Sequence, residues 1–190
     1  MRFIFATVAA AALFASPAFA ADDGGFYAGA GIGSASIDID LIEGVDFSGD
    51  DTAFKVFGGY GFNQYIAVEL EYIDGGTAED SYSDGVDTLK IGIDLSGFNA
   101  NVVGAWPIGE QFKIFGKIGM LFWDADFNAK LNGVLIPDGE DSDSGEDFSW
   151  GIGGSWDFTD NIGAQIEYQG FEIEDVDTAD LISASVYWRF

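Results

Sequence analysis

The sequence predicts an all-β protein, an eight-stranded antiparallel up-and-down transmembrane β-barrel. Three observations predict it: a secretory signal at the N-terminus, apolar and polar residues that alternate along most of the chain, and a C-terminal strand that ends in an aromatic residue. The even positions of 182–190 are apolar, whereas the odd positions are polar from Ser183 onward. An apolar outer face and a polar inner face are typical of a lipid-facing barrel strand.

The N-terminal segment has the features of a secretory signal peptide. Arg2 supplies a positive charge, residues 3–15 are apolar, and Ala18-Phe19-Ala20 is a small-residue cleavage site. No other stretch approaches the ~20 consecutive apolar residues of a membrane helix. An exported chain that is 48% hydrophobic is then either a soluble periplasmic protein or an outer-membrane barrel. We predict a cleaved signal peptide at 1–20 and one barrel domain at 21–190.

Composition favours the barrel. Roughly 170 residues remain after the signal (190 − 20), which suits one domain of eight strands with their connections. The chain has no cysteine, which excludes a disulfide framework and a thiolate metal site. Its three prolines, at positions 17, 107 and 137, lie outside the predicted strands, where proline would remove a ladder hydrogen bond.

The connections between the alternating segments differ in length. Short turns at 63–64, 107–111 and 159–161 alternate with long acidic loops at 38–51, 74–87, 128–147 and 173–180. In outer-membrane barrels the turns are periplasmic and the long loops extracellular, so we expect both chain ends in the periplasm. The predicted strands are 25–37, 52–62, 65–73, 88–106, 112–127, 148–158, 162–172 and 181–190.

Several segments together carry a family resemblance: GFYAGAGIG at 25–33, FGGYGFNQYIAVELEY at 57–72, FKIFGKIGMLFWDAD at 112–126, DNIGAQIEYQG at 160–170 and the terminal YWRF. With these, the chain resembles the small eight-stranded outer-membrane barrels of the OmpA/OmpX type, a porin-like group. The resemblance implies a location in the outer membrane of a Gram-negative bacterium. It also implies that Phe190 is part of the signal that the outer-membrane assembly machinery reads on the C-terminal strand.

Aromatic residues collect at the predicted strand ends, where rings with one polar edge favour the headgroup region. A soluble core would not sort its rings in this way and leave the opposite face charged. We predict a periplasmic girdle of Trp106, Phe112, Trp156, Phe158, Trp188 and Phe190, and an outer girdle of Tyr72, Phe122, Trp150 and Tyr168.

The inward face carries charges of both signs. Buried charges persist only when they are paired and hydrogen-bonded, so we interpret them as a lumen ion-pair network. Its predicted members are Lys55, Glu69, Glu71, Lys113, Lys117, Asp157, Glu167 and Arg189. We expect Arg189→Ala to lower stability markedly, because an interior carboxylate would lose its partner.

The strand at 88–106 breaks the alternation. Its apolar positions are odd from Leu89 to Leu95 and even from Phe98 onward, so the apolar face switches near Ser96-Gly97. A β-bulge at Gly97 would restore the facing. Alternatively, the upper part stands above the membrane and packs its apolar face inward.

Catalytic chemistry has little support. The chain has no histidine, the usual general base of barrel hydrolases and acyltransferases. Glu69 and Glu71 share one strand face and could form an acid–base pair, but a structural pair facing lysines is favoured. Glycines at 29, 31 and 33 match part of a dinucleotide-binding fingerprint without the following helix, so they are assigned to interior space. We predict a non-enzyme without a cofactor.

The charge is strongly acidic, with 33 acids, seven basic residues and a net charge of −26. Most of the acids fall in the predicted extracellular parts, which would repel nucleic acid and also lipopolysaccharide phosphates unless divalent cations bridge them. Asp138, Glu140, Asp141 and Asp143 are the candidate calcium ligands. The run departs from the EF-hand pattern, because glycine takes a ligand position and Ile152 stands in place of the bidentate Glu; a solvated loop is favoured.

The predicted function is structural: a monomeric barrel that supports envelope integrity, contacts outer-membrane lipid and displays acidic loops. A narrow ion channel is one alternative, although the position of an inward arginine used for gating in the resembling family is here Gln165. An adhesin acting through the loops is another. A soluble lipocalin-like barrel is the third, and it would need an apolar pocket instead of interior charges.

Overall fold

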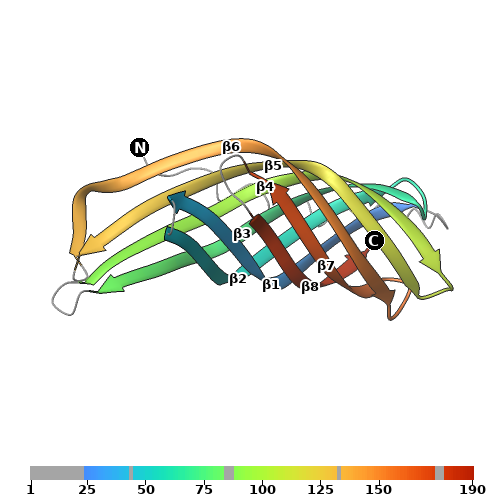
Figure 1. The fold of residues 1–190 in the computed structure, drawn as a ribbon. Coiled ribbons are helices and arrows are strands. Elements are labelled where there is room, and N and C mark those ends of the chain that lie inside the picture. The colour runs from blue at the N-terminus through green and yellow to red at the C-terminus, as the bar shows by residue number, and fades with distance from the viewer. Residues whose placement is uncertain (1–23, 43–44, 84–87, 132–133, 174–177) are drawn as a thin grey trace.

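The computed structural model describes residues 24–42, 45–83, 88–131, 134–173 and 178–190, and the signal-peptide prediction therefore lies outside the described residues. Within these ranges no helix is long and apolar enough to cross a membrane. Eight antiparallel strands form a closed barrel in which each strand pairs with the next along the chain (Figure 1). The predicted fold is confirmed. The strands are β1 (Gly25–Ile42), β2 (Val45–Gly61), β3 (Ile66–Ser83), β4 (Thr88–Ile108), β5 (Phe112–Leu131), β6 (Val134–Asp157), β7 (Ile162–Glu172) and β8 (Thr178–Arg189).

Pairing between the first and last strands closes the barrel. The β1–β8 register runs from Tyr27 opposite Arg189 to Asp38 opposite Thr178. Beyond it, the Phe190 N–H donates a hydrogen bond of 3.0 Å to the Phe26 carbonyl. Closure gives the backbone N–H and C=O groups of the two edge strands hydrogen-bond partners, which the hydrocarbon of a bilayer cannot provide.

Short turns connect the strands at the barrel end that holds residues 25 and 190. In the turn after β2, the Asn63 side-chain oxygen accepts hydrogen bonds from the backbone N–H groups of Tyr65 and Ile66 (2.8 and 3.0 Å). In the turn after β6, the Thr159 hydroxyl accepts one from the Ile162 N–H at 2.9 Å. These side chains bind backbone N–H groups that have no partner strand where the chain reverses, as Asn and Thr commonly do in turns.

The long loops predicted at 38–51, 74–87 and 128–147 are wrong: the structure continues as strand through most of them. The acidic run at 138–147 belongs to β6 and not to a loop. Above the bilayer both faces of a hairpin meet water, so the alternation fades while the ladder hydrogen bonds persist. Figure 1 shows the result, with β4 to β6 much longer than β7 and β8.

The register irregularity beside β4 arises in β3 and not in β4 itself. Strand β4 pairs with β5 without a shift from Leu89–Leu131 to Ile108–Phe112, so the described residues show no bulge at Gly97 on that side. One extra residue is in β3, between Asp74 and Thr77, where Gly75 and Gly76 stand against Leu95 alone and Gly76 has a φ of 74° that favours glycine. Leu95 keeps the inward parity and lines an interior cavity, which fits the second alternative; the side chains of residues 89–93 lie outside those described.

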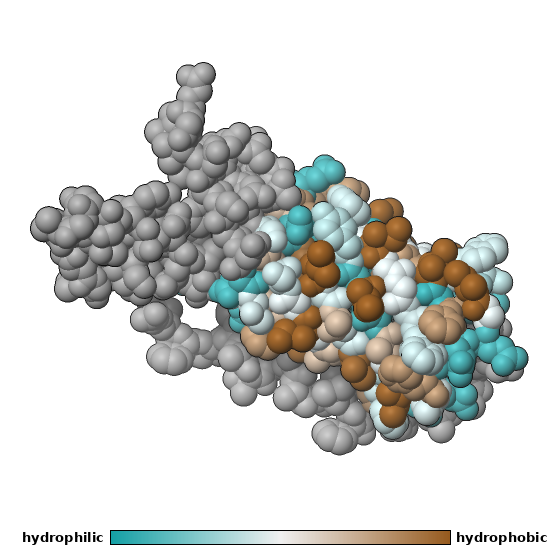
Figure 2. Space-filling view, turned by 60° about the horizontal axis from the view of Figure 1, so that its bottom comes forward, coloured by the Kyte–Doolittle hydropathy of each residue, from teal (hydrophilic) through white to brown (hydrophobic). Residues whose placement is uncertain are grey.

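The outer surface is apolar, as the alternation predicts. Ile166 and Trp106 are 67% and 66% exposed, and Figure 2 shows apolar side chains among more polar ones on the described part of one face. Rings of the predicted girdles contact one another across strands: Phe112 stacks on Trp156 with centroids 5.2 Å apart, and Trp150 lies 5.6 Å from Tyr168.

Interior rings pack over glycines. A Cβ added to Gly59 would stand 2.4 Å from the Tyr27 ring, and one at Gly153 would stand 2.4 Å from the Phe115 ring. In each case ring and glycine are directly opposite in the register. The same arrangement joins Phe57 to Gly29, Tyr187 to Gly163 and Trp123 to Gly145. Glycine therefore gives room to the interior, as inferred for positions 29, 31 and 33.

Candidate functional site

The lumen contains three groups of side chains that follow one another along the barrel axis. The mouth cluster, at the short-turn end, consists of Lys113, Asp157, Tyr187 and Arg189. The central cluster consists of Lys55, Glu69, Glu71, Lys117 and Glu167. The apolar plug consists of Ala53, Ile73 and Leu181, against which Ala35 and Phe171 pack.

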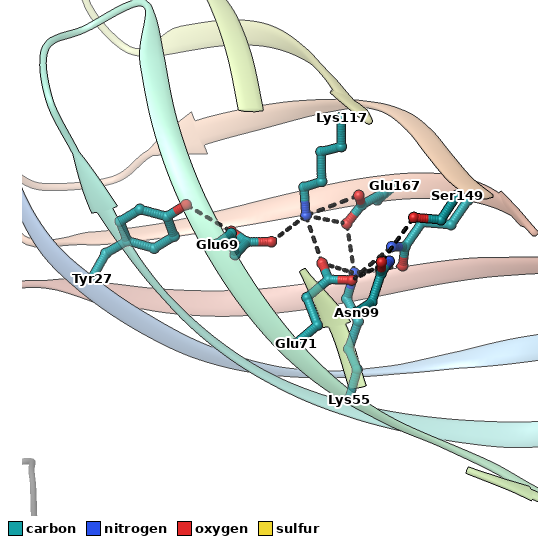
Figure 3. Close-up of polar contacts among 9 residues, drawn as sticks. Tyr27, Lys55, Glu69, Glu71, Asn99, Lys117, Ser149 and Glu167 are labelled. Atoms are coloured by element: carbon teal, nitrogen blue, oxygen red, sulfur yellow. Dashed lines mark hydrogen bonds and ion pairs between the residues drawn. The ribbon is translucent and has the colours of Figure 1, made fainter. Parts of the chain in front are cut away.

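The central cluster joins strands β2, β3, β5 and β7 (Figure 3). The Lys117 Nζ lies 2.5 Å from Glu69 Oε1, 2.7 Å from Glu71 Oε1 and 2.9 Å from Glu167 Oε1. The Lys55 Nζ lies 2.5 Å from Glu167 Oε2 and 3.8 Å from Glu71 Oε1. All five side chains are at most 2% exposed, so each depends on its partners to offset lost hydration.

Neutral donors complete the shell of the carboxylates. The Tyr27 hydroxyl donates to Glu69 Oε2 at 2.8 Å, and the Gln169 amide donates to Glu71 Oε2 at 2.7 Å. Asn99 donates to the same Glu71 oxygen at 3.4 Å and accepts a 2.8 Å bond from Ser149. Alternation places these neutral residues inside but gives no sign that they bind the carboxylates.

The mouth cluster is more open to solvent. Asp157 accepts hydrogen bonds from the Tyr187 hydroxyl at 2.5 Å and from the Arg189 guanidinium, and its other oxygen lies 3.3 Å from the Lys113 Nζ. The Lys113 and Arg189 side chains are 24% and 32% exposed. The structure thus brings the eight predicted lumen residues together in two separate clusters. Because Asp157 has three partners, the reason given for a marked effect of Arg189→Ala does not hold.

The apolar plug lies on the other side of the central cluster. Ala53 and Leu181 are each 1% exposed. The adjoining cavity, lined by Leu95, Leu121 and Trp123 among others, has a volume of about 30 Å³, which leaves room for only a few water molecules. The interior is therefore filled by side chains at this level, as expected for a barrel of eight strands.

The remaining candidate sites are the pair Glu69 and Glu71 and the acidic run from Asp138 to Asp143. Glu69 and Glu71 both contact the Lys117 ammonium, as the interpretation of a structural pair facing lysines predicts. Asp143 is exposed on β6 and accepts a 2.9 Å bond from the Ser144 N–H. The side chains of Asp138, Glu140 and Asp141 lie outside those described. Among the described side chains, no three His, Cys, Asp or Glu residues are grouped as metal ligands would be.

Solved structures of small outer-membrane barrels resemble this fold. Neisserial surface protein A matches with a TM-score of 0.63 at 16% identity, covering 87% of this chain and 97% of that one. Ail of Yersinia pestis matches with a TM-score of 0.57 at 17% identity, covering 87% and 99%. The N-terminal barrel of Pseudomonas aeruginosa OprF matches with a TM-score of 0.55 at 14% identity, covering 87% and 98%.

The sequence itself matches a family. A comparison with curated protein sequences returned no significant match. The model of the outer membrane protein β-barrel domain, however, matches residues 6–190, nearly the whole chain. This family implies the outer membrane of Gram-negative bacteria. The chain belongs to the outer membrane protein β-barrel domain family.

Proposed function

We propose that this protein is a sealed outer-membrane barrel that supports envelope integrity and neither conducts ions nor catalyses a reaction. The observation that carries the proposal is the filled lumen: a central cluster at most 2% exposed, followed by the apolar plug. An ion crossing the barrel would have to separate Lys117 from three carboxylates and then displace Leu181. Both steps oppose conduction.

Planar-bilayer recording tests the sealed lumen. The refolded full chain should insert without discrete conductance steps, and insertion is checked by the heat-dependent shift in electrophoretic mobility typical of folded barrels. Reproducible steps from the folded protein would favour the ion-channel alternative. A deletion strain that becomes sensitive to detergent, and is rescued by the wild-type gene, would support the envelope role.

Export and assembly are part of the same proposal. A signal peptide at 1–20 is removed by cleavage, and the C-terminal strand with Phe190 presents the chain to the assembly machinery. The exposed Phe190 ring and its backbone bond to Phe26 support this role for the closing strand. The barrel is a monomer in contact with lipid and with lipopolysaccharide, whose phosphates need divalent cations beside so acidic a protein. Phe190→Ala should lower the amount of assembled barrel in outer-membrane fractions.

A second candidate function is adhesion through the extended hairpins. The observation that favours it is the length of β3 to β6 beyond β7 and β8, together with exposed acids such as Asp124, Asp143 and Glu146. Ail was solved with a heparin analogue, sucrose octasulfate. The acidic hairpins of this chain would repel such a polyanion, so a cationic partner is expected here. Amide replacement of these three acids should reduce cell binding to a polylysine surface without changing barrel assembly.

A further inference from the structure

The central cluster contains more negative than positive charge. Three carboxylates, those of Glu69, Glu71 and Glu167, meet the two ammonium groups of Lys55 and Lys117 among the described side chains. All are almost completely buried, and an uncompensated charge in such a place is costly. One further positive charge, such as a proton on one carboxylate, would balance the cluster locally; the matching excess of positive charge lies in the more exposed mouth cluster, where Lys113 and Arg189 face the single carboxylate of Asp157.

The contacts differ among the three carboxylates. Glu71 forms ion pairs with Lys117 and Lys55 and accepts hydrogen bonds from Gln169 and Asn99. Glu167 forms ion pairs with the ammonium groups of both Lys55 and Lys117. Glu69 forms an ion pair with Lys117 alone among the described residues and accepts a hydrogen bond from the Tyr27 hydroxyl, so its negative charge is the least compensated of the three. Figure 3 shows it at the side of the cluster, between Tyr27 and Lys117.

Buried polar groups continue from the mouth toward this cluster along β7 and β8. Starting at Tyr187 in the mouth cluster, each step of two residues along β8 reaches Ser185, opposite Gln165, and then Ser183, opposite Glu167. The Ser183 and Ser185 hydroxyls and the Gln165 side-chain nitrogen have no hydrogen-bond partner among the described residues, although each side chain is more than nine-tenths buried.

A fourth such group lies beside Glu69 itself. Asn101 is directly opposite Glu69, is 5% exposed, and its side-chain nitrogen has no partner in the described part of the chain. Buried donors are almost always hydrogen-bonded, and water is the usual partner where several polar atoms line one space. On the far side of the cluster the row ends, because the next inward residue of β8 after Ser183 is Leu181 of the apolar plug.

We propose that Glu69 holds a proton at neutral pH and exchanges it with solvent at the short-turn mouth through water bound along Ser183, Ser185 and Gln165. A proton delivered by hydronium converts the carboxylate to the acid and leaves water, and release reverses the step, so no co-reactant is needed. Glu69 itself contacts Tyr27 and Lys117 and lies opposite Asn101. The other described groups of the cluster and its shell are Lys55, Glu71, Asn99, Ser149, Glu167 and Gln169, with Ser183 opposite Glu167.

Carbon-13 NMR of glutamate-labelled protein in lipid tests the proton. In the wild type at neutral pH, the side-chain carboxyl of Glu69 should give a neutral-acid signal with a deuterium isotope shift, while Glu71 and Glu167 give carboxylate signals. Histidine cannot confuse the titration, because the chain has none. Glu69→Gln should lose the acid signal, Lys55→Met should add a second one, and Glu110→Gln, in a periplasmic turn, should change neither. A wild type whose glutamates are all carboxylates would overturn the proposal.

Cysteine labelling tests the route. Because the chain has no cysteine of its own, a thiol reagent will label only the introduced cysteine. Ser183→Cys and Ser185→Cys proteins in oriented vesicles should react with a small impermeant thiol reagent from the short-turn side alone. Leu181→Cys, one step further along β8, should resist the reagent from that side. Reaction of the two serine-site variants from the hairpin side, or from neither side, would overturn the water route even if Glu69 is protonated. Both results are independent of the conductance recording.

Discussion

The centre of the lumen and its mouth both pair cations with carboxylates, but they differ in burial. Lys117 and Lys55 at the centre are 2% and 1% exposed, whereas Lys113 and Arg189 at the mouth are 24% and 32% exposed. At the centre, losing one partner leaves charges with no access to bulk water. At the mouth, water can replace a lost partner. Burial, more than the number of ion pairs, therefore decides how much each lysine contributes to stability.

The largest effect is expected for Lys117→Met. It removes the ammonium group that contacts Glu69, Glu71 and Glu167 together. Breaking a buried pair in this way costs roughly 3–5 kcal/mol of unfolding free energy. Urea unfolding in lipid vesicles, followed by the folded-band mobility shift, measures it. Lys113→Met is the matched control, with an expected loss within about 1 kcal/mol; equal losses would break the contrast.

An intermediate effect is expected for Gly59→Ala. The new methyl group would stand 2.4 Å from the Tyr27 ring and displace the phenol that donates to Glu69. Overpacking of this kind costs about 1–3 kcal/mol. Gly58→Ala is the control on the same strand, because its Cβ would have its nearest neighbour at 3.7 Å. The same unfolding assay should separate the two variants, and indistinguishable midpoints would argue against close packing at the centre.

The smallest effect is expected for Arg189→Ala. Asp157 retains Lys113 and the Tyr187 hydroxyl, and the site is partly exposed. We expect a loss of roughly 1 kcal/mol or less, reduced further by added salt. Unfolding at low and high ionic strength measures it. A loss as large as that of Lys117→Met would mean that the mouth is as dry as the centre.

Alternation was sufficient to predict eight strands and the inward side for the eight charged residues of the lumen. It could not predict which charges meet, because that depends on the register of all eight strands: Lys55 and Glu167 are 112 positions apart in the chain. The division into two clusters therefore required the structure.

The hairpins escaped prediction for a different reason. The two-residue period of a barrel strand comes from one face meeting lipid. Where β6 leaves the bilayer, both faces meet water and the sequence becomes evenly acidic, although the strand pairing continues to Val134. The glycines at 75 and 76 did not mark the β3 irregularity in advance, because glycines are frequent throughout the chain.

Double-mutant cycles on one pair from each cluster test the contrast most directly. The pairs are Lys55–Glu167 at the centre, 2.5 Å apart, and Lys113–Asp157 at the mouth, 3.3 Å apart. The coupling free energy from urea unfolding should exceed about 2 kcal/mol at the centre and stay below about 1 kcal/mol at the mouth. Equal coupling in the two clusters, or a larger value at the mouth, would contradict the account.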